Sequence, residues 1–216
     1  MSAARRRWGW LLAAVAVLAV VTVAVPALRV TLLRAAGWAL VVDEPLAPAD
    51  IVVIAVDADG AGVLEAADLV HGGIAPAVAV FEDPPDAVDR EFLRRGVPYE
   101  DQSARSMRQL RSLNVTAVEQ IPAAVTGSES EGGALAAWCD RRHFRTIVLV
   151  TTPDHSRRLH RLLRRAMRGR PTRVIVRATR YAAFQPEAWW TTRVGVRTEI
   201  VELQKLLLDV IRHPLS

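Results

Sequence analysis

The chain of 216 residues contains one cysteine and one lysine, and it has no internal repeat. A single cysteine, Cys139, can form no internal disulfide, which excludes a cysteine-rich scaffold and a zinc site built from several cysteine ligands. We expect Cys139 to be a small buried residue. Because the chain also lacks a low-complexity linker, its length predicts one domain with a single hydrophobic core, plus an appendage.

Acidic residues are outnumbered by basic ones, 23 against 28, so the formal net charge is +5. Such an excess is compatible with an anionic partner, either nucleic acid or a membrane surface. However, every basic residue except Lys205 is arginine, in a chain rich in alanine and valine. We attribute this pattern to genome composition, so the net charge by itself identifies no partner.

Charged residues are absent from residues 8–28, "WGWLLAAVAVLAVVTVAVPAL". A helix of this length spans roughly 30 Å of hydrocarbon, which predicts one transmembrane helix. Arg5, Arg6 and Arg7 precede it and favour a cytoplasmic N-terminus with the remainder translocated. A cleaved signal peptide is the alternative.

The predicted organisation follows from this segment. It consists of a basic tail (1–7), a single-pass anchor in the lipid bilayer of the cell membrane (8–28), a juxtamembrane linker (29–47) and an extracytoplasmic α/β domain (48–216).

Apolar, β-branched runs alternate with helical patterns along the predicted domain. The strands are expected at 50–56, 76–81, 115–121, 145–151 and 172–179, and the helices at 62–72, 85–96, 103–113, from 129, from near 156, and at 197–212. This alternation implies crossover connections. It predicts a doubly wound, mostly parallel sheet with helices on both faces.

Polar residues follow several of these strands, where parallel sheets bind ligands. The candidates are Asp57, Asp59, Glu82, Asp83, Ser128, Glu129, Glu131, Thr151, Thr152, Asp154 and His155. His155 stands at a strand-to-helix turn, where an imidazole suits acid–base work. Structural roles compete with the functional ones. Asp154 or Ser156 can cap the following helix, Ser128 and Glu131 have capping-box spacing, and Asp57 and Asp59 lie in a turn that favours aspartate.

The helix after His155 is crowded with arginine. Its apolar stripe consists of Leu159, Leu162, Leu163, Ala166 and Met167, which leaves Arg157, Arg161, Arg164, Arg165 and Arg168 outside it. A nucleic-acid partner is not expected, because the anchor would place these arginines outside the cytoplasm. Contact with anionic lipid headgroups is the better use of that face. Arg158, three residues after His155, is predicted to hold an anionic substrate group.

From Pro48 onward, an ordered set of motifs resembles the SanA/ElyC/YdcF family of bacterial envelope proteins, a domain of unknown function. The matching pieces are "PADIVVIAV", "LVHGGIAP", "EFLRRGVP", "SESE", "VLVTTPDHSRRL", "WW" and a late Glu202 with Lys205. His155 and Arg158 form the most specific element. The resemblance implies a Rossmann-like fold and a role in envelope integrity, through peptidoglycan or polyprenyl lipid-carrier metabolism.

The chain departs from the family pattern at two turns. "AVDADG" stands where the family carries a glycine run, and "FEDPP" replaces a small Ser-Gly-Gly-like turn. An arginine near the start of the first helix also has no counterpart in residues 60–67. A cleft lined by the carboxylates would repel a bare phosphate unless a divalent cation bridged them. The site therefore either uses such a cation or has lost the family's chemistry.

Three functional hypotheses follow. The first is an enzyme acting on a phosphate- or sugar-bearing envelope intermediate, in which His155 is the acid or base, Arg158 binds the anion and Glu131 orients either His155 or Arg158. Ser128, Thr152 and Asp57 are its further substrate contacts. The second is a non-catalytic protein that binds a ligand or partner in the same cleft. The third is a cation-dependent variant. No cofactor, resident metal or oligomeric state is assigned.

Overall fold

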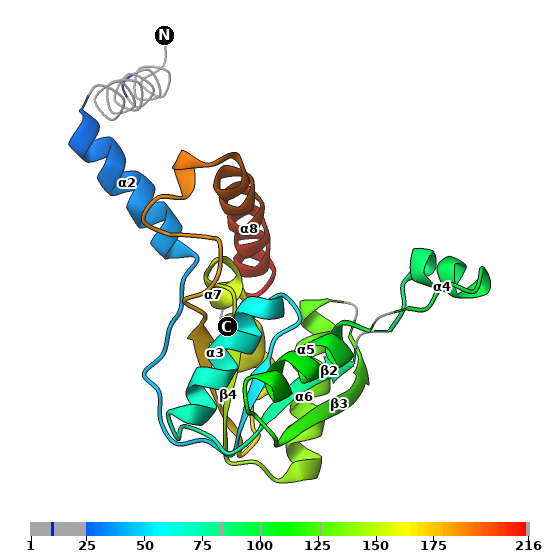
Figure 1. The fold of residues 1–216 in the computed structure, drawn as a ribbon. Helices are drawn as coiled ribbons and strands as arrows, with labels where there is room; N and C mark the ends of the chain where they lie inside the picture. The colour runs from blue at the N-terminus through cyan, green and yellow to red at the C-terminus, as the bar shows by residue number, and fades with distance from the viewer. Residues whose placement is uncertain (1–9, 11–24, 83, 100, 126, 215–216) are drawn as a thin grey trace.

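The computed structural model describes residues 10, 25–82, 84–99, 101–125 and 127–214. It shows an α/β fold around a five-stranded, all-parallel sheet (Figure 1). The strands are β1 (Ile51–Ile54), β2 (Val78–Glu82), β3 (Val118–Ala124), β4 (Thr146–Thr151) and β5 (Arg173–Ala178). Each overlaps the apolar run predicted for it.

The strand order across the sheet is β3-β2-β1-β4-β5. The chain builds outward from β1 through β2 to β3, then crosses back to place β4 on the other side of β1. The order therefore reverses between β1 and β4. In a doubly wound sheet this switch point, at the carboxyl ends of the strands, is where a crevice opens.

Helices cover both faces of the sheet, as predicted. One face is packed against α3 (Asp59–His71) and α5 (Gln102–Ser112), and the other against α6 (Ser128–Arg142) and α7 (Pro153–Ala166). Alternate residues of β1 serve the two sides, since Val53 belongs to the α6/α7 core and Val52 to the α3/α5 core. The prediction of one core was wrong, because a parallel sheet buried on both faces separates two. Cys139 is buried in the α6/α7 core, as predicted.

Four further elements lie outside these layers: α2 (Pro26–Ala39), α4 (Ala87–Arg94), the 3₁₀ turn η1 (Trp189–Thr191) and α8 (Arg193–Arg212). Helix α4 projects from the body of the molecule (Figure 1) and buries none of its residues. Helix α8 packs on α7. It begins four residues before its predicted start, because the Thr192 side chain accepts a hydrogen bond from the Gly195 N–H at 2.9 Å.

The chain that follows α2 is docked on the domain. Leu40 is buried, and the Val42 N–H donates to Ser156 Oγ at 2.8 Å. Arg157 donates to the carbonyl oxygens of Ala39 and Val41. Part of the segment predicted as a juxtamembrane linker is thus held against α7.

The predicted anchor, 8–28, falls largely on residues 1–9 and 11–24, outside the described residues. Within the described part of the chain, no helix is both long and apolar enough to cross a bilayer.

The start of α7 differs from the prediction. The helix begins at Pro153, where a missing N–H is tolerated, and neither Asp154 nor Ser156 caps it. Ser156 Oγ instead donates to the Pro153 carbonyl oxygen at 2.8 Å while accepting from Val42. The earlier start brings His155 and Arg158 onto the first turns of the helix, with Arg158 one turn after His155.

Candidate functional site

A cavity of about 350 Å³ opens beside the β1/β4 switch point. Its lining includes all six residues predicted as the site: Asp57, Ser128, Glu131, Thr152, His155 and Arg158. These residues come from three places, namely the end of β1, the start of α6 and the start of α7 with its N-cap. The rest of the lining is Val56, Gly127, Asp154, Glu202 and Lys205. The last two come from α8.

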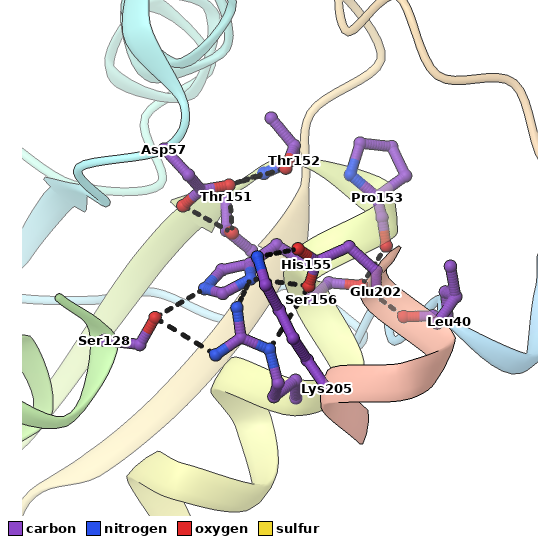
Figure 2. Close-up of polar contacts among 11 residues, drawn as sticks. Leu40, Asp57, Ser128, Thr151, Thr152, Pro153, His155, Ser156, Glu202 and Lys205 are labelled. Atoms are coloured by element: carbon purple, nitrogen blue, oxygen red, sulfur yellow. Dashed lines mark hydrogen bonds and ion pairs between the residues drawn. The ribbon is translucent and has the colours of Figure 1, made fainter. Parts of the chain in front are cut away.

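His155 lies at the centre of a polar cluster and is only 6% exposed (Figure 2). Its Nε2 is 3.1 Å from Ser128 Oγ, and its Nδ1 is 2.7 Å from the nearer Arg158 nitrogen. A guanidinium can only donate hydrogen bonds, so we assign Nδ1 as the acceptor. The ring proton then resides on Nε2 and is donated to Ser128.

Arg158 connects the cluster. Beyond its contact with His155, it donates to Glu202 Oε2 at 3.2 Å and to Ser128 Oγ at 3.3 Å. Ser128 Oγ thus accepts from two directions, which leaves its own hydroxyl proton available for a bound ligand. The capping-box alternative for Ser128 and Glu131 is wrong. Ser128 lies inside α6, whose N-cap is Gly127, and no side chain caps the helix.

Glu202 is the anionic partner of this cluster. Its Oε2 lies 3.4 Å from His155 Nδ1, and its Oε1 accepts from Lys205 Nζ at 2.6 Å. Burial raises the pKa of Glu202, but its polar contacts with His155 and Lys205 and the charge of Arg158 outweigh burial and lower the pKa to about 2. Glu202 is therefore ionised at any physiological pH.

Glu131 faces the same cavity in a different state. It is 2% exposed, and its carboxylate accepts from the Val56 N–H at 3.1 Å. Burial, followed by the negative charge of Asp57, raises the pKa of Glu131 to about 7. A carboxyl group that exchanges its proton near neutrality, beside an imidazole, is a suitable general acid or base.

Asp57 joins the ends of β1 and β4 (Figure 2). Its carboxylate accepts from Thr151 Oγ1, from Thr152 Oγ1 and from the Thr152 N–H, at 2.5 to 3.0 Å. The neighbouring Asp154 has a raised pKa, chiefly because it is buried. The hydrogen bonds from Thr151 and Thr152 to Asp57 hold the turn between β4 and α7, and His155 lies in the first turn of the helix that follows.

The other acidic candidates do not join this cavity. Asp59 and Glu82 line a separate cavity of about 160 Å³ beside β2, and Asp83 is outside the described residues. Asp59 also lines a third cavity, of about 540 Å³, together with Asp57, Thr152 and Asp154. The expectation of one cleft lined by all the carboxylates was therefore wrong for Glu82, whereas Asp59 shares a cavity with Asp57 but not with His155. Among the residues that the structure describes, no group of three or more histidine, cysteine or acidic side chains is placed to hold a metal ion.

Glu202 and Lys205 are the members of the cluster that sequence reasoning did not nominate. Their i, i+3 spacing in the last helix was visible as part of the family resemblance, but nothing local to α8 indicated that they would face His155. Comparison with known proteins adds no assignment, since no protein-family model matches the chain and no curated protein is significantly similar to it.

Proposed function

We propose that this protein is a membrane-anchored, extracytoplasmic enzyme of the bacterial cell envelope, of the SanA/ElyC/YdcF kind. Its substrate would be a phosphate- or sugar-bearing intermediate of peptidoglycan or polyprenyl lipid-carrier metabolism. The observation that carries the proposal is the hydrogen-bonded cluster of Ser128, His155, Arg158 and Glu202, which combines a proton carrier with a cation in one cavity.

Arg158 is the anion-binding group in this proposal. A substrate phosphate that draws the guanidinium toward itself competes with Glu202, whose other oxygen stays paired with Lys205. The same movement removes the donor that faces His155 Nδ1. Nδ1 can then carry the ring proton and donate it to Glu202, which leaves Nε2 unprotonated.

In that tautomer His155 accepts a proton from Ser128 or from a water molecule at the same position, as a general base. Without the anion, Nε2 keeps its proton and Ser128 is not activated. Glu131 would take up or release a proton near neutral pH in the same cavity. Substrate binding and proton transfer are thereby coupled through Arg158.

A non-catalytic binding protein is the second candidate. It is favoured by the turn after β1, where Asp57 occupies the switch point and uses its carboxylate on Thr151 and Thr152. A glycine-rich turn would instead present backbone N–H groups to a phosphate. In this case the cavity would bind its ligand without turnover.

The test is a thermal-shift titration of the detergent-solubilised chain with polyprenyl phosphate analogues, nucleotide-sugars, S-adenosylmethionine and Mg²⁺. A ligand that binds the folded state raises its melting temperature. We expect one class to do so in the wild type and to lose most of the effect in Arg158→Ala. His160→Ala and Arg164→Ala are the matched controls, because both residues lie on α7 outside the cavity lining.

Turnover of the ligand found in this way separates the two candidates. The enzyme proposal expects product with the wild type and none with His155→Ala, although that variant still binds. Equal shifts in all variants, or no shift with any ligand, would refute the site. Binding without product in the wild type supports the binding protein instead.

A further inference from the structure

Helix α8 exposes a row of large apolar side chains. Val194, Ile200, Val201, Leu207, Leu208 and Ile211 are all exposed, Leu207 by 59% and Ile211 by 65%. Their spacing places them on the side of the helix that faces away from α7. The helix has 20 residues and is about 30 Å long, so these side chains form an extended apolar patch rather than isolated exposed residues.

Charges on α8 are divided between its two sides. The acidic residues, Glu199, Glu202 and Asp209, face inward, and Asp209 binds Arg161 and Arg165 of α7. The charged residues of α8 that are exposed are Arg193, Arg197, Lys205 and Arg212, all basic. The outward face therefore combines apolar side chains with positive charge and no negative charge.

This arrangement changes the expectation for the arginines of α7. Arg161 and Arg165 are covered by α8, and Arg157 is occupied by backbone carbonyls of the chain after α2. Arg164 and Arg168 stay exposed. The surface best suited to lipid headgroups thus lies on α8 rather than on α7.

We propose that the outward face of α8 docks on an anionic lipid bilayer. An amphipathic helix with an apolar stripe flanked by basic residues binds such a surface by burying the stripe among the headgroups. The inference takes the membrane location from the proposed function but does not depend on the chemistry of the cavity.

The position of α2 supports this occupant. Helix α2 lies on the same side of the molecule as α8 (Figure 1), and the segment between β5 and α8 binds it, with Trp189 Nε1 donating to the Leu33 carbonyl oxygen at 2.7 Å. The uncharged sequence 11–25 leads directly into α2, whose own charged residues, Arg29 and Arg34, are both basic. A bilayer that holds the preceding sequence would therefore lie next to α8.

A second copy of the chain fits this face less well. An antiparallel pair of α8 helices would bring Arg193 and Arg197 of one copy toward Arg212 of the other, with no exposed acidic residue on the helix to pair with them. Like charges placed opposite one another oppose association. An anionic lipid surface meets the same charges favourably.

A groove connects this face with the candidate site. It has a volume of about 180 Å³, and Arg158 and Lys205 line both the groove and the His155 cavity. Its lining also includes Leu208 and Arg212 of the outward face, together with Glu129 and Asp209. Docking through α8 would thus place this groove, and with it one side of the candidate site, next to the bilayer.

The test uses the full chain reconstituted in vesicles of equimolar phosphatidylglycerol and phosphatidylcholine. An environment-sensitive fluorophore is attached at Leu207→Cys, and quenching by nitroxide-labelled lipids is measured. Arg141→Cys, at the exposed C-terminal end of α6, is the matched control. The native Cys139 is buried and is not expected to react in the folded protein.

We expect several-fold stronger quenching at position 207 than at position 141, and a loss of that difference when Arg193→Glu and Arg197→Glu are introduced together. Equal quenching at the two positions would overturn the proposal. So would a disulfide that forms between two copies through Leu207→Cys, since a second copy would then cover the face. Ligand shifts in detergent report on the cavity without vesicles, so failure here is distinguishable from failure of the proposed function.

Discussion

Glu199 of α8 offers a quantitative test of the structure, because its side chain is fully buried and neither carboxylate oxygen has a hydrogen-bond partner among the described residues. Burial, followed by the negative charge of Asp154, raises the pKa of Glu199 from its ordinary 4.5 to about 7. The folded protein therefore keeps this proton up to about pH 7, whereas the unfolded chain releases it near 4.5. Because the unfolded state then binds fewer protons, the free energy of unfolding falls as the pH rises through this window.

The size of this loss follows from the two pKa values. Between about pH 5 and about pH 9, Glu199 alone should remove roughly 2 to 3 kcal/mol from the free energy of unfolding, at about 1.4 kcal/mol for each pH unit of the window. Glu199→Gln cannot ionise, so its stability relative to the wild type should improve by that amount over the same interval. Glu199→Met also removes the unpartnered polar group, so it should be more stable than Glu199→Gln by about 1 to 3 kcal/mol at both pH values.

The assay is urea unfolding of the detergent-solubilised chain at both pH values, followed by far-UV circular dichroism. Taking the difference between variant and wild type cancels the contributions of other titrating groups, including Glu131. A difference between Glu199→Gln and the wild type that is the same at both pH values would refute the reasoning, since it would mean that the carboxylate is hydrated or paired in the folded state.

Three further predictions use the same unfolding assay. Glu202→Gln should lower the free energy of unfolding by about 3 to 5 kcal/mol at neutral pH, because it leaves Arg158 buried without its counter-charge. Since the pKa of Glu202 lies at about 2, the wild type should lose this advantage over the variant only as the pH falls below 4.5 toward 2. An equal effect of the substitution at pH 2 and pH 7 would contradict the ion pair. Gly132→Ala should cost about 1 to 3 kcal/mol, because its new Cβ would clash with the Cδ2 atom of the buried Leu162. Gly133→Ala, which meets nothing within 4 Å, should instead be neutral or stabilising by up to about 1 kcal/mol, and equal effects of the two would argue against this α6–α7 packing. Ser156→Ala should cost about 1 to 3 kcal/mol by leaving the Val42 N–H without its acceptor, and an unchanged midpoint would show that residues 40–42 are not docked on α7.

The sequence by itself determined the layered fold and six of the residues that line the cavity. Continuous β-branched runs placed the strands, because a strand buried on both faces needs apolar residues without interruption. His155 and Arg158 were identifiable together, since a helix that starts after a strand brings residues three apart onto one face. The rule that ligands bind at strand carboxyl ends then pointed to Asp57, Ser128 and Thr152, which all line the cavity.

Only the tertiary structure decided what these residues do to one another. Whether Ser128 caps its helix or faces His155 depends on where α6 starts relative to β4, and the capping-box spacing is the same in both cases. Glu202 is 47 positions from His155 along the chain, and it meets the imidazole because α8 packs on α7. The same packing buries Glu199 and the ion pairs of Asp209 and turns the apolar side of α8 outward. Local patterns report periodicity and burial, whereas the partner of a buried charge is set by which helices come into contact.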